Sequence, residues 1–226
     1  MLRGPERDDP YHLIRIMPAE ERSFLMSNNI NTNTRSGNTR MLTEGGLCIA
    51  LSIALSFLKI PIGLSFGGFG GSIDLVMVPL VFFALKWGPG WGCTAGFVFG
   101  TLKYFLASGF AISWISIIFD YSVAYGAVGL AGLFRNKGGV PTAGRSALGA
   151  LTGCVARFII HYISGVTVYA QWMPEEFMNM KMGSPVVYSL LYNGTYMLPN
   201  TILCVAVIVL LNKPLMNLYR TDARVK

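Results

Sequence analysis

Charged residues are scarce in this sequence, and two motifs of common ATPases and metallohydrolases are absent. Asp, Glu, Lys and Arg together make up only 13% of the 226 residues. There is no phosphate-binding loop of the Walker type and no HExxH zinc motif. The chain therefore lacks the usual means of hydrolysing ATP, and we expect a protein that is not an enzyme.

Metal ligands and paired cysteines are also few. The four cysteines, Cys48, Cys93, Cys154 and Cys204, lie in separate apolar stretches, and the sequence contains only two histidines. Neither a disulfide framework nor a zinc site is expected from such a pattern. We therefore expect no cofactor.

Long apolar runs dominate what is present, since 53% of the residues are hydrophobic. About twenty apolar residues cross a bilayer as a helix. Six such segments occur, at residues 41 to 59, 73 to 88, 90 to 107, 111 to 133, 146 to 169 and 186 to 211. The sequence therefore predicts an all-α integral membrane protein with six transmembrane helices.

The polar ends and the basic residues predict the domains and the orientation. Residues 1 to 40 are too polar to form a core, so we expect a disordered cytoplasmic tail, with residues 1 to 25 an upstream extension. The membrane domain would cover residues 41 to 212, and residues 213 to 226 a basic cytoplasmic tail. Ten Lys and Arg residues fall in alternate connections and three in the others, which predicts that both termini are cytoplasmic. Topology explains the net charge of +7 better than nucleic-acid binding does.

Three Lys residues towards segment ends, Lys59, Lys86 and Lys103, are counted with the connections, and Glu44 opens the first segment. Four further ionisable residues fall inside the predicted membrane segments: Asp74, Asp120, Arg157 and His161. Each would cost several kcal/mol there unless it is paired or faces a cavity. The predicted topology places Asp74, Asp120 and His161 at one depth, towards the outside. They are therefore candidates for a binding site, although Arg157 could instead neutralise Asp120, and a structural hydrogen bond could explain Asp74.

Aromatic and amide side chains fall near the same depth. Gly165 and Tyr169 continue a stripe from Arg157 and His161 at four-residue spacing, although Gly165 could simply permit helix contact. The remaining candidates are Tyr121, Tyr188 and Asn193. A carboxylate with aromatic rings and an amide suits a small aromatic ligand that carries a positive charge.

A second type of site is indicated on the first segment. Gly46 and Ala50 form a pair of small residues four apart, which lets another helix approach closely. The pair could serve packing within the bundle or the docking of a partner protein. The sequence leaves both open.

Several stretches resemble the thiamine-specific S component of the energy-coupling factor (ECF) vitamin transporters. They are Met41 to Glu44, Asp120-Tyr121, Arg157 to Gly165 and Tyr188 to Gly194. The resemblance implies a six-helix membrane protein that captures thiamine from outside. It also implies a T transmembrane component and two ATPase subunits as partners, with membrane lipid around the chain.

The resemblance carries the family's site onto residues of this chain. The substrate-binding positions fall on Asp74, Asp120, Tyr121, Arg157, His161, Gly165, Tyr169, Tyr188 and Asn193. The positions that dock the T component fall on Gly46 and Ala50. The resemblance thus implies two separate roles: the first set of residues captures the substrate, and Gly46 and Ala50 couple the chain to its partner.

Four positions depart from the family pattern. Asp120 replaces a Glu, Tyr169 a Trp, Phe110 a Tyr and Gly70 a Trp, while Phe66 or Phe69 could supply a lid aromatic. The ligand is therefore expected to be thiamine, with its pyrimidine portion or another vitamin as alternatives. A gradient-driven carrier that uses Asp120, Arg157 and His161, or a purely structural membrane protein, are further alternatives.

Overall fold

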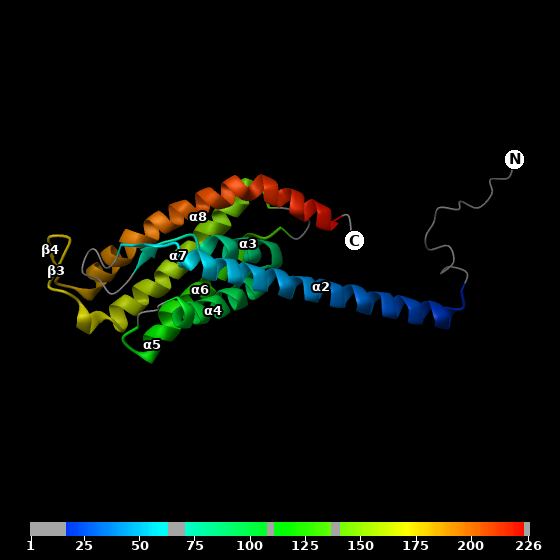
Figure 1. Cartoon of the computed structure of the whole chain (residues 1–226), viewed down its shortest axis with the longest axis horizontal. Helices are drawn as coiled ribbons and strands as arrows, with labels where there is room; N and C mark the ends of the chain where they lie inside the picture. The colour runs from blue at the N-terminus through cyan, green and yellow to red at the C-terminus, as the bar shows by residue number, and fades with distance from the viewer. Residues whose placement is uncertain (1–16, 63–70, 108–110, 137–140, 224–226) are drawn as a thin grey trace. The chain divides into compact units, whose positions relative to one another are not determined.

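The computed structural model describes residues 17–62, 71–107, 111–136 and 141–223, with side chains omitted for residues 24–36 and 215–223. Its described part is mostly helical (Figure 1). The chain divides into two compact units, Met1–Thr43 and Glu44–Lys226. The second unit holds every predicted ligand-binding residue.

The first helix, α2, runs over Ala19–Ser56 and starts earlier than the sequence predicts. A disordered tail was expected up to residue 40, whereas residues 19 to 40 are helical here. Once the apolar residues 41 to 56 form a helix, each further residue adds a hydrogen bond without a new nucleation cost. Glu20 and Glu21 in the first turn also complement the positive end of the helix dipole. The domain boundaries themselves stay a prediction.

Two helices at a tight turn form the buried centre of the second unit. Helix α3 covers Met77–Trp87 and α4 covers Pro89–Leu106, separated by Gly88 with a φ of 97°. A positive φ favours glycine, and Pro89 then starts α4 with a preset helical φ. The side chains of Leu80 and Val81 on α3 are almost fully buried in the main hydrophobic core.

The next helical path changes its winding at Asp120. It consists of α5 (Trp114–Ser116), the π-helical η2 (Ile117–Val123), α6 (Ala124–Val128) and the 3₁₀ turns of η3 (Gly129–Phe134). Helix α4 packs closely on it through Gly92, Gly96 and Gly100. A Cβ at Gly96 would collide with the backbone carbonyl of Tyr125, and one at Gly100 with that of Tyr121. The glycine face of α4 thus fixes the backbone beside Asp120.

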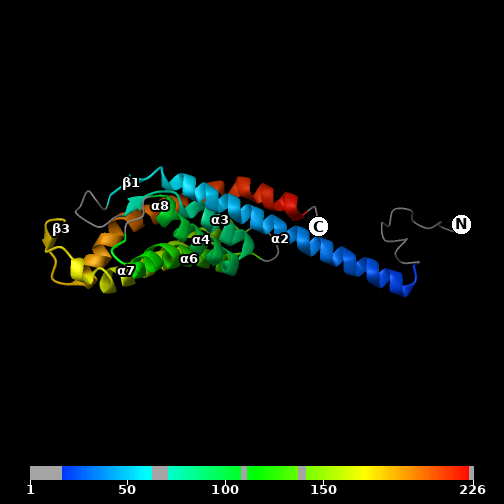
Figure 2. The ribbon, with the colours of Figure 1, turned by 60° about the horizontal axis from the view of Figure 1, so that its bottom comes forward.

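Helices α7 (Ala143–Thr167) and α8 (Pro185–Ala223) pack along each other, as Figures 1 and 2 show. Thr142 caps α7 by accepting from the backbone N–H of Arg145. The connection contains the short η4 (Ala170–Trp172) and an antiparallel hairpin of β3 (Glu176–Phe177) and β4 (Met180–Lys181). A second short pair, β1 (Ile60–Pro61) and β2 (Ser72–Ile73), precedes α3.

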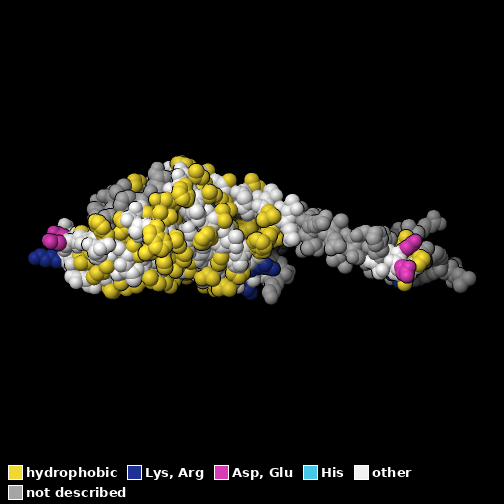
Figure 3. Space-filling view, turned by 90° about the horizontal axis from the view of Figure 1, so that it is seen from below, with side chains coloured by type: hydrophobic (Ala, Val, Ile, Leu, Met, Phe, Trp, Pro, Cys, Tyr) yellow, Lys and Arg dark blue, Asp and Glu magenta, His cyan; other side chains and the backbone are white. Residues whose placement is uncertain are grey.

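Three described helical paths are long and apolar enough to cross a membrane: Trp114–Phe134, Ala143–Thr167 and Pro185–Pro214. Met77–Trp87 is apolar but shorter. Hydrophobic side chains cover most of the face of the second unit in Figure 3, where the visible charged side chains gather towards its ends. The described helices correspond to the six predicted segments, while six membrane crossings and cytoplasmic termini remain predictions.

Candidate functional site

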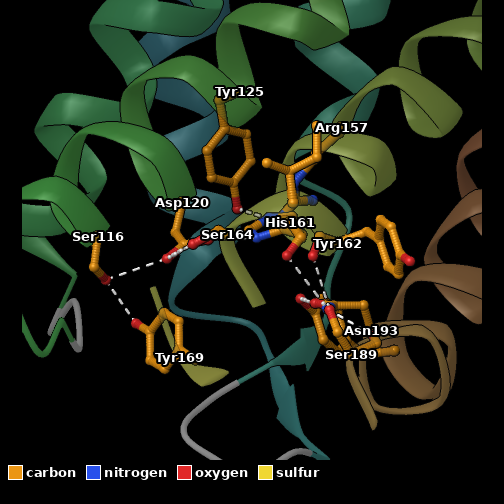
Figure 4. A network of polar contacts seen from close by, with 12 residues as sticks. Ser116, Asp120, Tyr125, Arg157, His161, Tyr162, Ser164, Tyr169, Ser189 and Asn193 are labelled. Carbon is orange, nitrogen blue, oxygen red and sulfur yellow. Dashed lines mark hydrogen bonds and ion pairs between the residues drawn. The ribbon is translucent and has the colours of Figure 1, made fainter. Parts of the chain in front are cut away.

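The carboxylate of Asp120 lies at the centre of a cluster of polar side chains between η2 and α7 (Figure 4). Its Oδ2 accepts hydrogen bonds from Ser116 Oγ at 3.2 Å and Ser164 Oγ at 3.0 Å. Its Oδ1 lies 3.2 Å from Nδ1 of His161. π-Helical turns occur often at functional sites, and this one presents Asp120 to α7. Asp120 and His161, which the sequence places at one depth, are therefore in contact.

Tyr169 joins this cluster from the turn that follows α7. Its hydroxyl lies 2.6 Å from Ser116 Oγ and also interacts with Asp120. Burial raises the pKa of Tyr169 to about 12, so the hydroxyl keeps its proton at neutral pH. A Trp at this position could not make the same contact, because its indole carries no hydroxyl.

Arg157 does not serve as the partner of Asp120 that the sequence allowed. Its Nη2 donates to the hydroxyl of Tyr125 at 2.9 Å, and its guanidinium lies 4.0 Å from the centre of the Tyr125 ring. The alternative in which Arg157 neutralises Asp120 is therefore wrong. The cation points along α7 towards α6 instead of across to η2.

Asp74 pairs with a residue that the sequence reasoning missed. Lys103 Nζ lies 3.2 Å from Asp74 Oδ2 and also donates to the Tyr125 hydroxyl. The count of basic residues by connection places Lys103 in an outer connection, but it lies within α4 and is only 7% exposed. Its place on the face of Gly92, Gly96 and Gly100 was the signal available in the sequence. The pair links through Tyr125 to Arg157, beside the Asp120 cluster.

Gly165 and Asn193 meet where α7 packs on α8. Asn193 Nδ2 donates to the backbone carbonyl of Ser189 at 2.9 Å and to that of His161 at 3.4 Å. A Cβ on Gly165 would lie 2.9 Å from Ser189 Cβ and closer still to its hydroxyl. Gly165 therefore permits helix contact, as one interpretation of the sequence held, and it lies beside the predicted site.

Aromatic side chains extend the site along α8. Tyr188 stacks on Tyr192 with ring centres 5.6 Å apart, and Phe177 of the hairpin packs edge-on against both. Tyr196 meets His161 edge-on at 6.1 Å. These rings form one wall beside His161. Phe177, Tyr192 and Tyr196 were not among the predicted residues.

Tyr121 points elsewhere in part, since its ring packs edge-on against Tyr104 of α4 at 5.2 Å. It follows Asp120 directly, so the two side chains leave the helix in different directions. Phe66, Phe69, Gly70 and Phe110 lie outside the described residues.

Several buried polar atoms at the site have no hydrogen-bond partner among the described residues. They are Nε2 of His161, Nε and Nη1 of Arg157, and the hydroxyl of Tyr188. Buried polar groups are normally paired, so each such atom needs an explanation such as a water or a ligand. The described residues contain no group of three His, Cys, Asp or Glu that could hold a metal ion. The arrangement fits the binding of an organic molecule.

The predicted docking residues lie away from the core on the outer face of α2. Gly46 and Ala50 are exposed, and a Cβ on Gly46 would meet no atom of the described residues within 4 Å. Gly45, beside them, faces Phe83: a Cβ added at Gly45 would lie 3.1 Å from Cζ of the Phe83 ring. Packing inside the second unit therefore uses Gly45 and leaves Gly46 and Ala50 open.

Comparison with known proteins gives one family. The model of a family described as "Thiamine transporter protein" matches residues 42–220. Thiamine transporter ThiT of Bacillus subtilis (strain 168) is 31% identical over 162 residues, which are 68% of this chain and 81% of that protein. Thiamine transporter ThiT of Lacticaseibacillus paracasei is 27% identical over 180 residues, 74% of this chain and 84% of that protein.

A solved structure of ThiT from Listeria monocytogenes has the same fold, with a TM-score of 0.67 and 22% identity. The matched region covers 79% of this chain and 96% of the Listeria chain. These relatives and the apolar helices identify a multi-pass protein of the cell membrane. The chain belongs to the thiamine transporter protein family, whose model spans it from residue 42 to residue 220.

Proposed function

We propose that this chain is the high-affinity thiamine-binding S component of an ECF importer and captures the vitamin from the outer side. The observation that carries the proposal is the state of Asp120. Its carboxylate is largely buried, and among the described residues no Lys or Arg lies within ion-pair distance of it. When His161 is neutral, a largely buried carboxylate with no Lys or Arg beside it favours a ligand that brings a positive charge. The thiazolium ring of thiamine does so.

The remaining contacts suit the other half of thiamine. If Nδ1 of His161 carries its proton towards Asp120, Nε2 is left as an acceptor. That acceptor and the unpaired hydroxyl of Tyr188 could bind the amino group and ring nitrogens of the aminopyrimidine. The rings of Tyr188 and Tyr196 supply faces and edges for aromatic contact. We assign the nine predicted ligand-binding residues to one thiamine pocket around Asp120 and His161, with Asp74 and Gly165 in supporting roles.

Binding is tested by titrating the detergent-purified protein, stripped of bound ligand, with thiamine and with its isolated pyrimidine alcohol. Quenching of the four tryptophans reports binding. Tight binding of thiamine is the expected result. Tight binding of the pyrimidine alone would reassign the substrate to a precursor, and binding of neither would reject the proposal.

Coupling is tested separately, because capture alone moves nothing across the membrane. We propose that a T component and two ATPase subunits supply the energy, with Gly46 and Ala50 on the docking face. Uptake in cells should require the ATPase subunits and should survive an ionophore that collapses ion gradients. If uptake occurs without the ATPase subunits and an ionophore abolishes it, the result would instead favour a gradient-driven carrier that uses Asp120, Arg157 and His161.

A further inference from the structure

We infer that the hydroxyl of Tyr169, acting with Ser116, positions the Asp120 carboxylate and thereby sets the preference of the pocket for a positively charged ligand. This inference rests on the proposed thiamine site and adds a role for two hydroxyl groups. In it, Tyr169 and Ser116 are positioning residues.

The first step is the direction of the hydrogen bonds. A serine hydroxyl has one proton, and that of Ser116 points to Asp120 Oδ2 at 3.2 Å. When Ser116 uses its proton on Asp120, the contact of 2.6 Å between Ser116 Oγ and the Tyr169 hydroxyl uses the proton of Tyr169. In this arrangement Tyr169 donates into the pair formed by Ser116 and Asp120. Hydrogen bonds in such a chain polarise and strengthen one another.

The second step is the orientation of the carboxylate. Ser116 and Ser164 both donate to Oδ2, and they are 0% and 1% exposed. Water therefore has little access to these donors, and the two hydroxyls fix one oxygen of Asp120. The other oxygen, Oδ1, is left on the side of His161. A short Asp side chain held in this way presents a fixed negative charge to the pocket.

The third step is the link between chain segments. Ser116 and Asp120 lie four residues apart on one helical path, whereas Ser164 belongs to α7 and Tyr169 to the turn after it. The hydroxyls thus tie η2 to the end of α7. Loss of the Tyr169 hydroxyl should loosen the carboxylate without removing the aromatic ring.

The experiment compares Tyr169→Phe, Ser116→Ala and the double variant, each stripped of ligand and titrated with two ligands. One ligand is thiamine, and the other is an uncharged isostere in which a thiophene ring replaces the thiazolium. Each single change should weaken thiamine binding about fivefold, the effect of one hydrogen bond, and change binding of the neutral isostere less than about twofold. The thiamine affinity of the double variant should equal that of the single variant with the lower affinity, because both changes break one connected set of hydrogen bonds.

Ser122→Ala is the matched control. Ser122 lies on the same π-helical turn and is buried, but its hydroxyl contacts Thr101 Oγ1 at 2.8 Å, away from Asp120. It should leave the affinity for both ligands unchanged. Retained binding of the neutral isostere also shows that each variant is folded.

Three results would overturn the inference while leaving the proposed function intact. One is an equal loss of affinity for thiamine and for the neutral isostere, which would indicate a general packing role. The second is unchanged thiamine binding in the single variants. The third is a loss of affinity in the double variant that equals the product of the two single losses. Failure of the unchanged protein to bind thiamine would reject the proposed function, and the inference with it.

Discussion

Asp120 is the residue on which the affinity for a positively charged ligand should depend most. Asp120→Asn keeps the size of the side chain but removes its negative charge. If thiamine binds here, its affinity should fall at least about tenfold, or about 1.4 kcal/mol, because the thiazolium loses its counter-charge. Titration by tryptophan quenching measures the loss, and thermal unfolding in detergent should show a stable fold. Equal affinity in the variant would remove Asp120 from the site.

Lys103 should matter for stability instead. Lys103→Met would leave the buried carboxylate of Asp74 without its cation, which commonly costs about 3 kcal/mol or more. The free energy of unfolding, measured by titration with a denaturing detergent, should fall by about that amount. The matched control is Lys103→Met combined with Asp74→Asn, which removes both charges and should recover at least half of the loss. No recovery would show that packing of the Lys103 chain, and not its charge, is important.

Residue types and predicted membrane depth allowed part of the site to be predicted, but they did not predict which side chains contact one another. Asp120 and His161 share a depth in the predicted topology, and they do meet. The partner of Arg157 could not be chosen in this way, because depth does not say which face of α7 turns to η2 and which to α6. Lys103 was missed because it lies near the end of an apolar segment, where exposure and burial look alike in the sequence.

At the scale of the helices, α7 and α8 pack closely at Gly165. Gly165→Ala places a methyl group against Ser189, so the free energy of unfolding should fall by about 2 kcal/mol. Thiamine binding should weaken as well, because Asn193 and His161 lie at the same contact. Both effects can be followed on one purified variant by unfolding and by titration.

Gly194→Ala is the matched control on α8, because a Cβ there meets no atom within 4 Å in the part of the chain that the structure describes. Alanine favours the helix, so this change should raise stability by about 0.5 kcal/mol. A second comparison adds Ser189→Gly to Gly165→Ala, which clears the space and should restore part of the loss. Equal destabilisation by both alanine changes would contradict the close contact.

Apolar segments predicted which parts of the chain are helical better than where the helices end. Hydropathy reports burial or lipid contact, whereas α2 and α8 continue beyond their apolar parts, to Ala19 and Ala223. The π-helical turn at Asp120 has no signature in the hydropathy pattern. It accompanies the close approach of Gly100 to the Tyr121 carbonyl, which joins residues that are distant in sequence.

For the whole molecule, the predicted topology places the hairpin outside and the start of α7 inside. Glu176→Cys should react with a membrane-impermeant thiol reagent in intact cells, whereas Arg145→Cys should react only after the membrane is opened. Both positions are exposed. The test uses a background in which Cys48 and Cys93 are replaced by Ala, since Cys154 and Cys204 are buried. The reverse pattern of labelling would show that the chain has the opposite orientation in the membrane.

Coupling to a partner should depend on the open face of α2. Gly46→Trp adds bulk where no described residue of the chain lies within 4 Å of an added Cβ, so thiamine binding and stability should stay unchanged. If this face docks the T component, the same variant should lose most uptake in cells, because helices that meet through small residues cannot accommodate an indole.

Leu148→Trp is the control for bulk on another exposed apolar position, since Leu148 lies on α7 and is 52% exposed. It should retain both binding and uptake. Uptake is measured with labelled thiamine in cells that carry the ATPase subunits, and binding is measured on the purified variants. Full uptake by Gly46→Trp would place the docking face elsewhere, whereas loss of thiamine affinity would mean that this part of α2 supports the pocket and not the partner.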